Sequence, residues 1–156
     1  MIRMNKLTDY GVVLLTTFAH EPALGISARE LSVRTEIPQP TVVKLLKTLL
    51  KAGLLVSQRG TKGGYALARS PEEIPVAAII EALEGPLAIT ECSLPGTCAH
   101  ERGCPARPNW KAVNDVIQDA LSRLTLADMT RPASSGATRT GSPLPAVDSA
   151  PRSIAS

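Results

Sequence analysis

The sequence predicts a mainly α-helical protein that contains a winged helix-turn-helix domain and a long C-terminal helix suited to dimerisation. Near the N-terminus, three amphipathic segments are followed by a two-stranded hairpin with a basic, glycine-rich tip. Near the C-terminus, apolar residues again recur at three- and four-residue steps. We divide the chain into a winged domain (1–84), a cysteine loop (85–108), a dimerisation helix (109–130) and a disordered tail (131–156).

The first helix is predicted over Leu7–His20, where apolar positions follow helical spacing. Asn5 or Thr8 is placed to cap its start, and Glu21-Pro22 ends it because the residue before a proline avoids helical angles. The apolar run Gly11–Ala19 follows basic residues and superficially resembles a signal peptide. We favour a buried helix, because an acidic residue precedes the run and no small-x-small cleavage site follows it before the helix ends.

Two shorter helices complete the helix-turn-helix pattern. Ser27 is the expected N-cap of a helix over Ala28–Thr35, with Glu30 as its capping-box partner. After a short turn, Pro40 suits the first position of a third helix. This helix is expected to end just before Gly53.

The remaining elements are a hairpin and two further helices. Leu54–Gln58 and Tyr65–Ala68 are predicted as short strands joined by the glycine-rich loop. Helices are predicted over Pro75–Glu84 and Trp110–Leu126. Residues 131–156 contain four Pro, six Ser and no aromatic residue, a composition that predicts disorder.

Charge is unevenly distributed along the chain. Residues 29–69 carry eight basic and two acidic side chains, a net +6, whereas residues 70–130 carry four basic and nine acidic ones, a net −5. A basic helix-turn-helix and hairpin indicate a polyanionic partner. Only four residues are aromatic, which argues against a stacking surface for single-stranded nucleic acid. We therefore expect double-stranded operator DNA as the partner.

The third helix is expected to enter the major groove, with its N-terminal end at the base edges and its lysines near phosphates. The basic tip of the hairpin would approach the DNA closely, because its glycines have no side chains to prevent the contact. Lysines on a helix are, by themselves, usually only a solvated face. Here the lysine-bearing helix is followed by the basic hairpin, and both lie inside the +6 segment, so the combination favours DNA binding. The predicted DNA-binding residues are Ser27, Gln39, Pro40, Thr41, Lys44, Lys47, Arg59 and Lys62.

All three cysteines lie in the predicted loop, at Cys92, Cys98 and Cys104, with the spacing Cys-x5-Cys-x5-Cys. An odd, closely spaced set does not suit a secreted disulfide framework, and structural zinc sites use tighter pairs. The wide spacing, with a proline after the third cysteine, favours an iron–sulfur cluster held by thiolates. A zinc site or a thiol-based redox sensor is the alternative. Candidates for a fourth ligand are His100, Glu101 and Asp9.

The sequence argues against a membrane protein and against an enzyme. No apolar run approaches the ~18 residues that a membrane span requires. A thiol catalyst needs a low-pKa cysteine, usually in a Cys-x2-Cys or helix-start context, which the sequence lacks. We expect a cytoplasmic, non-enzymatic protein with reduced thiols.

Three stretches of the sequence form a distinctive combination: Lys6-Leu7-Thr8-Asp9-Tyr10, Arg59-Gly60-x-Lys62-Gly63-Gly64-Tyr65-x-Leu67-Ala68-Arg69 and Ile80-x-Ala82-Leu83-Glu84-Gly85. They resemble the Rrf-type family of winged-helix transcriptional regulators. The family includes the iron–sulfur regulator IscR and the nitric-oxide sensor NsrR, and the resemblance covers about residues 1–130. Leu87–Asp128 is most similar to the branch that controls the SUF cluster-assembly operon.

The resemblance implies a homodimer that pairs through its C-terminal helix, binds two operator half-sites and represses genes of iron–sulfur cluster assembly. It implies that the three cysteines hold a 2Fe–2S or 4Fe–4S cluster whose state tunes DNA affinity. A nitric-oxide or redox signal is the alternative input.

Two positions depart from the IscR pattern. Arg107 stands where IscR-like members have a histidine ligand, and a guanidinium cannot ligate. Asp9 stands where NsrR-like members use an aspartate from the other subunit, so Asp9 is the favoured fourth ligand and His100 the alternative. The second departure is Val43, which replaces a glutamate with which IscR discriminates between DNA sites.

Overall fold

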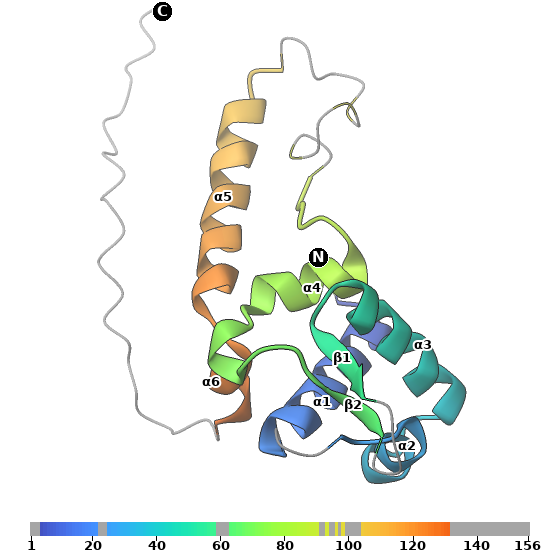
Figure 1. Ribbon diagram of the computed structural model, residues 1–156. Helices are drawn as coiled ribbons and strands as arrows, with labels where there is room; N and C mark the ends of the chain where they lie inside the picture. Colours follow the sequence, from blue (N-terminus) through green and yellow to red (C-terminus); the bar gives the residue numbers. More distant parts are fainter. Residues whose placement is uncertain are drawn as a thin grey trace, which may run out of the picture.

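The computed structural model describes residues 4–21, 25–58, 63–90, 93, 96, 98 and 104–131. Figure 1 shows a mainly helical protein with one two-stranded antiparallel wing, which confirms the predicted fold class. In chain order the elements are α1 (Lys6–His20), α2 (Ala28–Thr35), α3 (Gln39–Lys51), β1 (Leu55–Gln58), β2 (Gly64–Leu67), the 3-10 turn η1 (Pro71–Glu73), α4 (Val76–Glu84), α5 (Arg107–Arg123) and α6 (Leu126–Thr130).

The first two helices begin at polar caps that the sequence predicts. The Asn5 side-chain oxygen accepts hydrogen bonds from two backbone N–H groups of α1, at 2.7 and 3.0 Å. Ser27 caps α2 by accepting from the Glu30 N–H at 3.2 Å. The capping box predicted at α2 forms only by half, because the Glu30 carboxylate pairs with Arg34 at 2.6 Å instead.

The hydrophobic core lies where the helices of the winged domain meet. It also includes Leu126 from the C-terminal end of the described chain, so α6 packs into the same core as α1. Burial of each large apolar side chain contributes about 1.5–3 kcal/mol, so this core sets the relative positions of α2 and α3. Its largest fully buried side chains are Leu14, Leu15, Phe18, Ile26, Leu31, Val42, Leu46, Leu49, Leu54, Ile74, Ile79 and Leu126.

The base of the wing is joined to the segment before α2. Ile26 and Tyr65 exchange two backbone hydrogen bonds of 2.9 Å. Gly64 allows this close approach, because a Cβ there would lie 2.8 Å from backbone atoms of Gly25 and Ile26. The wing therefore leaves the body from a fixed position, while its tip (residues 59–62) lies outside the described residues.

The predicted bounds of the last helix, Trp110–Leu126, are wrong at both ends. α5 begins at Arg107, with Pro108 in its first turn, where a proline needs no N–H partner. It ends at Arg123, and the next two residues are extended before α6 begins.

The break between α5 and α6 has a local and a long-range cause. Thr125 caps α6: its hydroxyl accepts from the Asp128 N–H, and the Asp128 carboxylate accepts from the Thr125 N–H. Backbone hydrogen bonds of 2.8 Å join Leu124 to Val76, the first residue of α4, and Leu126 to Ile74 just before that helix. The C-terminal end of α5 is thereby fixed to the winged domain.

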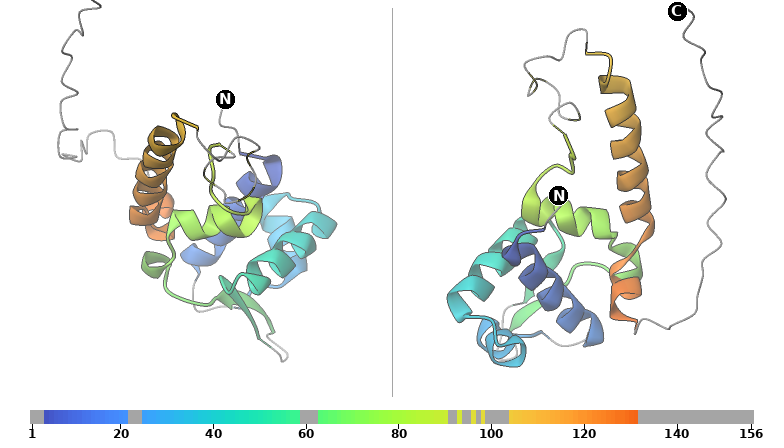
Figure 2. Two further views of the ribbon diagram at one scale, coloured as in Figure 1. Left: turned by 90° about the horizontal axis from the view of Figure 1, so that it is seen from above. Right: turned by 180° about the vertical axis from the view of Figure 1, so that it is seen from behind.

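The N-terminal end of α5 projects beyond the body, as Figures 1 and 2 show from several sides. Ile117 and Leu121 are half-buried against the rest of the chain. The other apolar residues of α5 stay exposed, by 44 % for Trp110, 44 % for Val113 and 63 % for Val116. Among the helices that the structure describes, none is long and apolar enough to cross a bilayer.

Candidate nucleic-acid interface and cysteine loop

The third helix presents two different faces. Its apolar face is buried in the core, whereas Lys44, Lys47 and Lys51 are exposed on the opposite face. At its N-terminal end Gln39 and Pro40 are exposed and Thr41 is half-buried. The cap residue Pro38 offers no side-chain hydrogen bond, so the positive end of the helix dipole is left open toward an anion.

The turn between α2 and α3 fixes the angle of the helix-turn-helix unit. Glu36 adopts a left-handed conformation with φ 56°, which reverses the chain after α2. Ile37 is buried, and its carbonyl accepts a hydrogen bond of 2.7 Å from the Ser32 hydroxyl. The turn at Glu36 and the hydrogen bond between Ser32 and Ile37 therefore fix the position of α3 relative to α2.

The predicted DNA-binding residues that the structure describes lie on the two helices of the helix-turn-helix unit. Ser27 lies at the start of α2, beside the base of the wing, and the remaining described members of the set lie on α3. The two predicted wing contacts, Arg59 and Lys62, lie outside the described residues.

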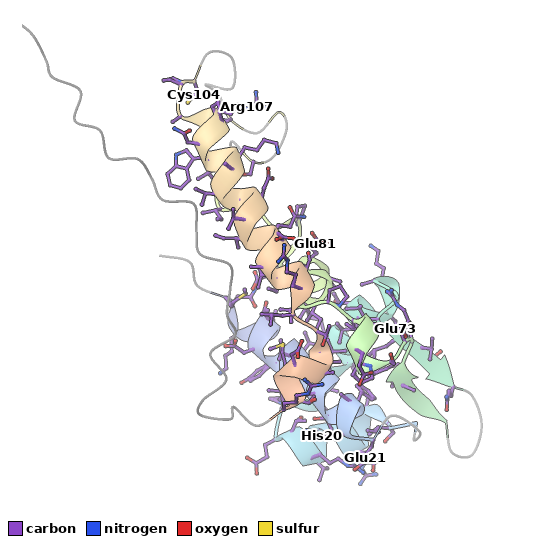
Figure 3. All side chains as sticks on the ribbon, turned by 90° about the vertical axis from the view of Figure 1, so that its left-hand side faces the viewer. His20, Glu21, Glu73, Glu81, Cys104 and Arg107 are labelled. Atoms are coloured by element: carbon purple, nitrogen blue, oxygen red, sulfur yellow. The ribbon has the colours of Figure 1, made fainter. Side chains whose placement is uncertain are left out.

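The cysteine loop is described only in part. Cys98 and Cys104 are half-buried, whereas Cys92, His100 and Glu101 lie outside the described residues. Figure 3 shows Cys104 and Arg107 at the end of α5 that points away from the body. Thiolates are the ligands that iron–sulfur clusters require. In the described part of one chain, however, no group of three or more His, Cys, Asp or Glu residues could hold a metal ion, so the exposed Asp9 joins no such group there.

A polar network fixes the beginning of this loop to α1. The Glu84 carboxylate accepts from the Asn5 backbone N–H and the Asn5 side-chain amide, both at 2.9 Å, and from the Thr8 hydroxyl. The Thr8 hydroxyl, followed by the Asn5 N–H, holds the pKa of Glu84 below its usual value. The start of α1 is therefore held on the last turn of α4, directly before Gly85.

This network makes stability depend on pH. A carboxyl whose folded-state pKa is lowered stabilises the fold at neutral pH, and this contribution is lost as the pH falls through the folded-state pKa. We expect Glu84→Gln to lower the melting temperature at neutral pH, and the deficit to shrink as the pH falls below the ordinary carboxyl value of about 4.3. Thermal melts over this range measure the effect. Glu81→Gln, at an exposed position of the same helix, is the control, and an equal deficit at neutral and acid pH would contradict the role of Glu84.

The same part of the loop is also tied to α5. Asn114 is 6 % exposed and is the buried residue of α5. Its side-chain oxygen accepts a hydrogen bond of 3.1 Å from the Ile89 N–H. A cavity of about 400 Å³ lies between α4, residues 85–89 and α5, with Ile80, Leu87 and Ile117 among its lining residues.

Comparison with known proteins identifies the family. A model described as "Rrf2: Iron-dependent Transcriptional regulator" matches residues 4–132. The chain belongs to the Rrf2 family. As an Rrf2 protein with a winged helix-turn-helix, it is a DNA-binding transcriptional regulator.

One relative and two solved structures illustrate what this chain is similar to. Protein rrf2 of Nitratidesulfovibrio vulgaris is 32 % identical over 135 residues, 85 % of this chain and 90 % of the relative. The structure of CymR, the global cysteine regulator of B. subtilis, has a TM-score of 0.68 at 26 % identity and covers 83 % of this chain and 97 % of that one. T. potens IscR has a TM-score of 0.63 at 31 % identity, over 82 % and 85 % of the two chains.

Proposed function

We propose that this Rrf2 protein is a dimeric repressor of iron–sulfur cluster assembly genes, in particular a SUF operon, and that a cluster in its cysteine loop controls its affinity for DNA. The observation that carries the proposal is the Cys-x5-Cys-x5-Cys spacing in a loop that starts directly after the Glu84–Asn5 contact and is attached to α5 through Ile89. The likeness to T. potens IscR and the iron-dependent family description support it. A repressor acts on the chromosome, so the site of action is the cytoplasm.

The DNA-binding half of the proposal rests on α3. Gln39, Pro40 and Thr41 read base edges at the start of the helix, where a recognition helix contacts the major groove. Lys44 and Lys47 neutralise phosphates from its exposed face. Ser27 adds a contact at the start of α2, and Arg59 and Lys62 add contacts from the wing.

The dimer is proposed to form through α5, because its exposed apolar residues need a partner. Within the described residues, Ile117 and Leu121 are half-buried, whereas Trp110, Val113 and Val116 of the same helix stay exposed and available for a second protomer. Pairing of two such helices would place two copies of α3 on half-sites separated by a helical turn of about 34 Å. In this arrangement residues 1–84 bind DNA, 85–108 sense the signal and 109–130 dimerise.

The proposed ligands are Cys92, Cys98 and Cys104, with Asp9 of the second protomer as the fourth ligand and His100 as the alternative. A bound cluster would be gained, oxidised or lost as the supply of iron, oxygen or nitric oxide changes, and this change is the signal. The chain contributes the thiolates and connects them to α1 and α5. The likeness to CymR favours a second candidate, in which the thiols respond without a cluster.

Anaerobic purification followed by visible spectroscopy and iron and sulfide analysis tests the cluster. We expect a coloured protein with bound iron and sulfide, and loss of the colour in Cys92→Ser, Cys98→Ser and Cys104→Ser. Asp9→Ala is expected to retain the colour for a shorter time. A wild-type protein that stays colourless and iron-free after reconstitution would refute the cluster and favour the thiol-based candidate.

A further inference from the structure

The segment that leads into the cysteine loop, residues 85–90, is held near both ends and lies along a cavity. At its beginning, Glu84 is bound to Asn5 and Thr8 of α1. Near its end, the Ile89 N–H donates to Asn114 of α5. The hollow of about 400 Å³ beside it is partly open to solvent, so the segment has free space between itself, α4 and α5. A small displacement of the loop would therefore change the hydrogen bonds at these two attachments.

Asn114 is an unexpected residue at its position. Burial of a side-chain amide costs free energy unless the amide is hydrogen-bonded. The helical neighbours of Asn114 on the same face are Ile117 and Leu121, so an aliphatic residue would continue their apolar packing. Asn114 instead accepts a hydrogen bond from Ile89, which lies 25 positions earlier in the sequence and three residues before Cys92.

The opposite end of α5 is attached to the DNA-binding half of the chain. The Leu124 carbonyl accepts from the Val76 N–H, and the Leu126 N–H donates to the Ile74 carbonyl, both at 2.8 Å. α4, which begins at Val76, packs on α3. A continuous series of packed elements thus joins Asn114 to the proposed recognition helix.

We propose that Asn114 is a positioning residue that couples the cysteine loop to α5. Through its bond to Ile89, it holds the residues before Cys92 in the position that retains the cluster, and it conveys the state of the loop to the helix. The inference rests on the proposed function, in which the loop holds a cluster.

Three variants separate the hydrogen bond from simple packing. Asn114→Leu keeps the volume and removes the acceptor, whereas Asn114→Asp keeps an acceptor oxygen. Asn109→Ala, at an exposed position of the same helix, is the control. The measurements are hydrogen exchange of residues 86–90 in the cluster-free protein, and the half-life of the visible absorption of the loaded protein in the presence of a chelator.

We expect Asn114→Leu to speed exchange at Ile89 and cluster loss by about tenfold each, the scale of one lost buried hydrogen bond. Asn114→Asp should restore both, and Asn109→Ala should change neither. Faster exchange at Ile89 with an unchanged cluster half-life would overturn the coupling. Asn114→Ala replaces the leucine variant if the latter does not fold by circular dichroism.

A wild-type protein that takes up no cluster would refute the proposed function separately. The coupling is then judged from alkylation of the cysteine thiols by iodoacetamide, followed by mass spectrometry. A several-fold faster reaction in Asn114→Leu than in Asn109→Ala supports it, and equal rates overturn it.

Discussion

Replacement of Lys44 and Lys47 together by alanine is expected to weaken operator binding roughly 30-fold at about 0.15 M salt. Both side chains are exposed on the face of α3 opposite to its buried leucines. Each phosphate contact releases about 0.9 counterion, so the loss of two contacts should reduce the slope of log affinity against log salt by about 2. Titrations of a selected operator duplex at several salt concentrations measure both quantities.

Lys111→Ala removes the same charge from a helix that we do not place at the DNA. Lys111 is exposed on α5 and pairs with Asp115 at 2.7 Å, so its loss should leave affinity and salt slope close to those of the wild type. Circular dichroism establishes that both variants are folded. A double lysine variant with wild-type affinity and slope would show that α3 does not face the phosphates.

Leu126→Ala is expected to lower the free energy of unfolding by about 2–5 kcal/mol, the usual cost of a cavity at a fully buried leucine. Leu126 is 0 % exposed and lies in the core formed by the first helices of the chain. The loss should therefore affect the winged domain and not only the C-terminal end. Urea denaturation followed by circular dichroism gives the free energy.

Met129→Ala is the matched control, because Met129 lies on the same short helix and is 43 % exposed. Its effect should stay within about 0.5 kcal/mol. Equal, small effects of the two substitutions would mean that α6 does not belong to the core.

Removal of residues 131–156 leaves Leu126 in place. We therefore expect the truncated protein to dimerise and to bind its operator specifically. The predicted disorder of this tail concerns mainly residues that lie outside the described part.

The sequence predicts the helix-turn-helix closely because its boundaries depend on local chemistry. The bounds of α2, Ala28–Thr35, agree with the prediction, since Ser27 is a strong cap. Gly53, with φ 72°, and Gly85, with φ 92°, follow their helices as the stop signals require. The strand bounds differ from the prediction by only one residue: β1 begins one residue later, at Leu55, and β2 lies one residue earlier, over Gly64–Leu67.

The C-terminal region is predicted less well because apolar periodicity alone does not reveal a break. Leu121, Leu124 and the residues around Leu126 continue a helical pattern, yet Thr125 starts a new helix. The spacing Thr125-x-x-Asp128 is a cap signature that could have indicated this boundary. The second cause, the backbone pairing with Ile74 and Val76 at the start of α4, arises only in the folded chain.

The attachments of the cysteine loop could not be predicted either, because they join residues far apart in sequence. Glu84 reaches Asn5 over 79 positions, and Asn114 reaches Ile89 over 25. No sequence pattern shows that the two members of either pair contact each other. The proposed DNA-binding residues are different: a basic segment and a helix start are local features, so Gln39, Lys44 and Lys47 could be proposed from the sequence alone.

The proposed function requires that this protein bind operator DNA with an affinity that a cluster controls. The most direct test selects a duplex from a randomised library and measures its dissociation constant with one protein sample, before and after removal of the cluster. We expect the two constants to differ by about 5- to 150-fold, the usual range of coupling between two sites, with protection of two half-sites in the tighter state. Identical constants in a protein whose cluster loss is verified by iron analysis would contradict the claim.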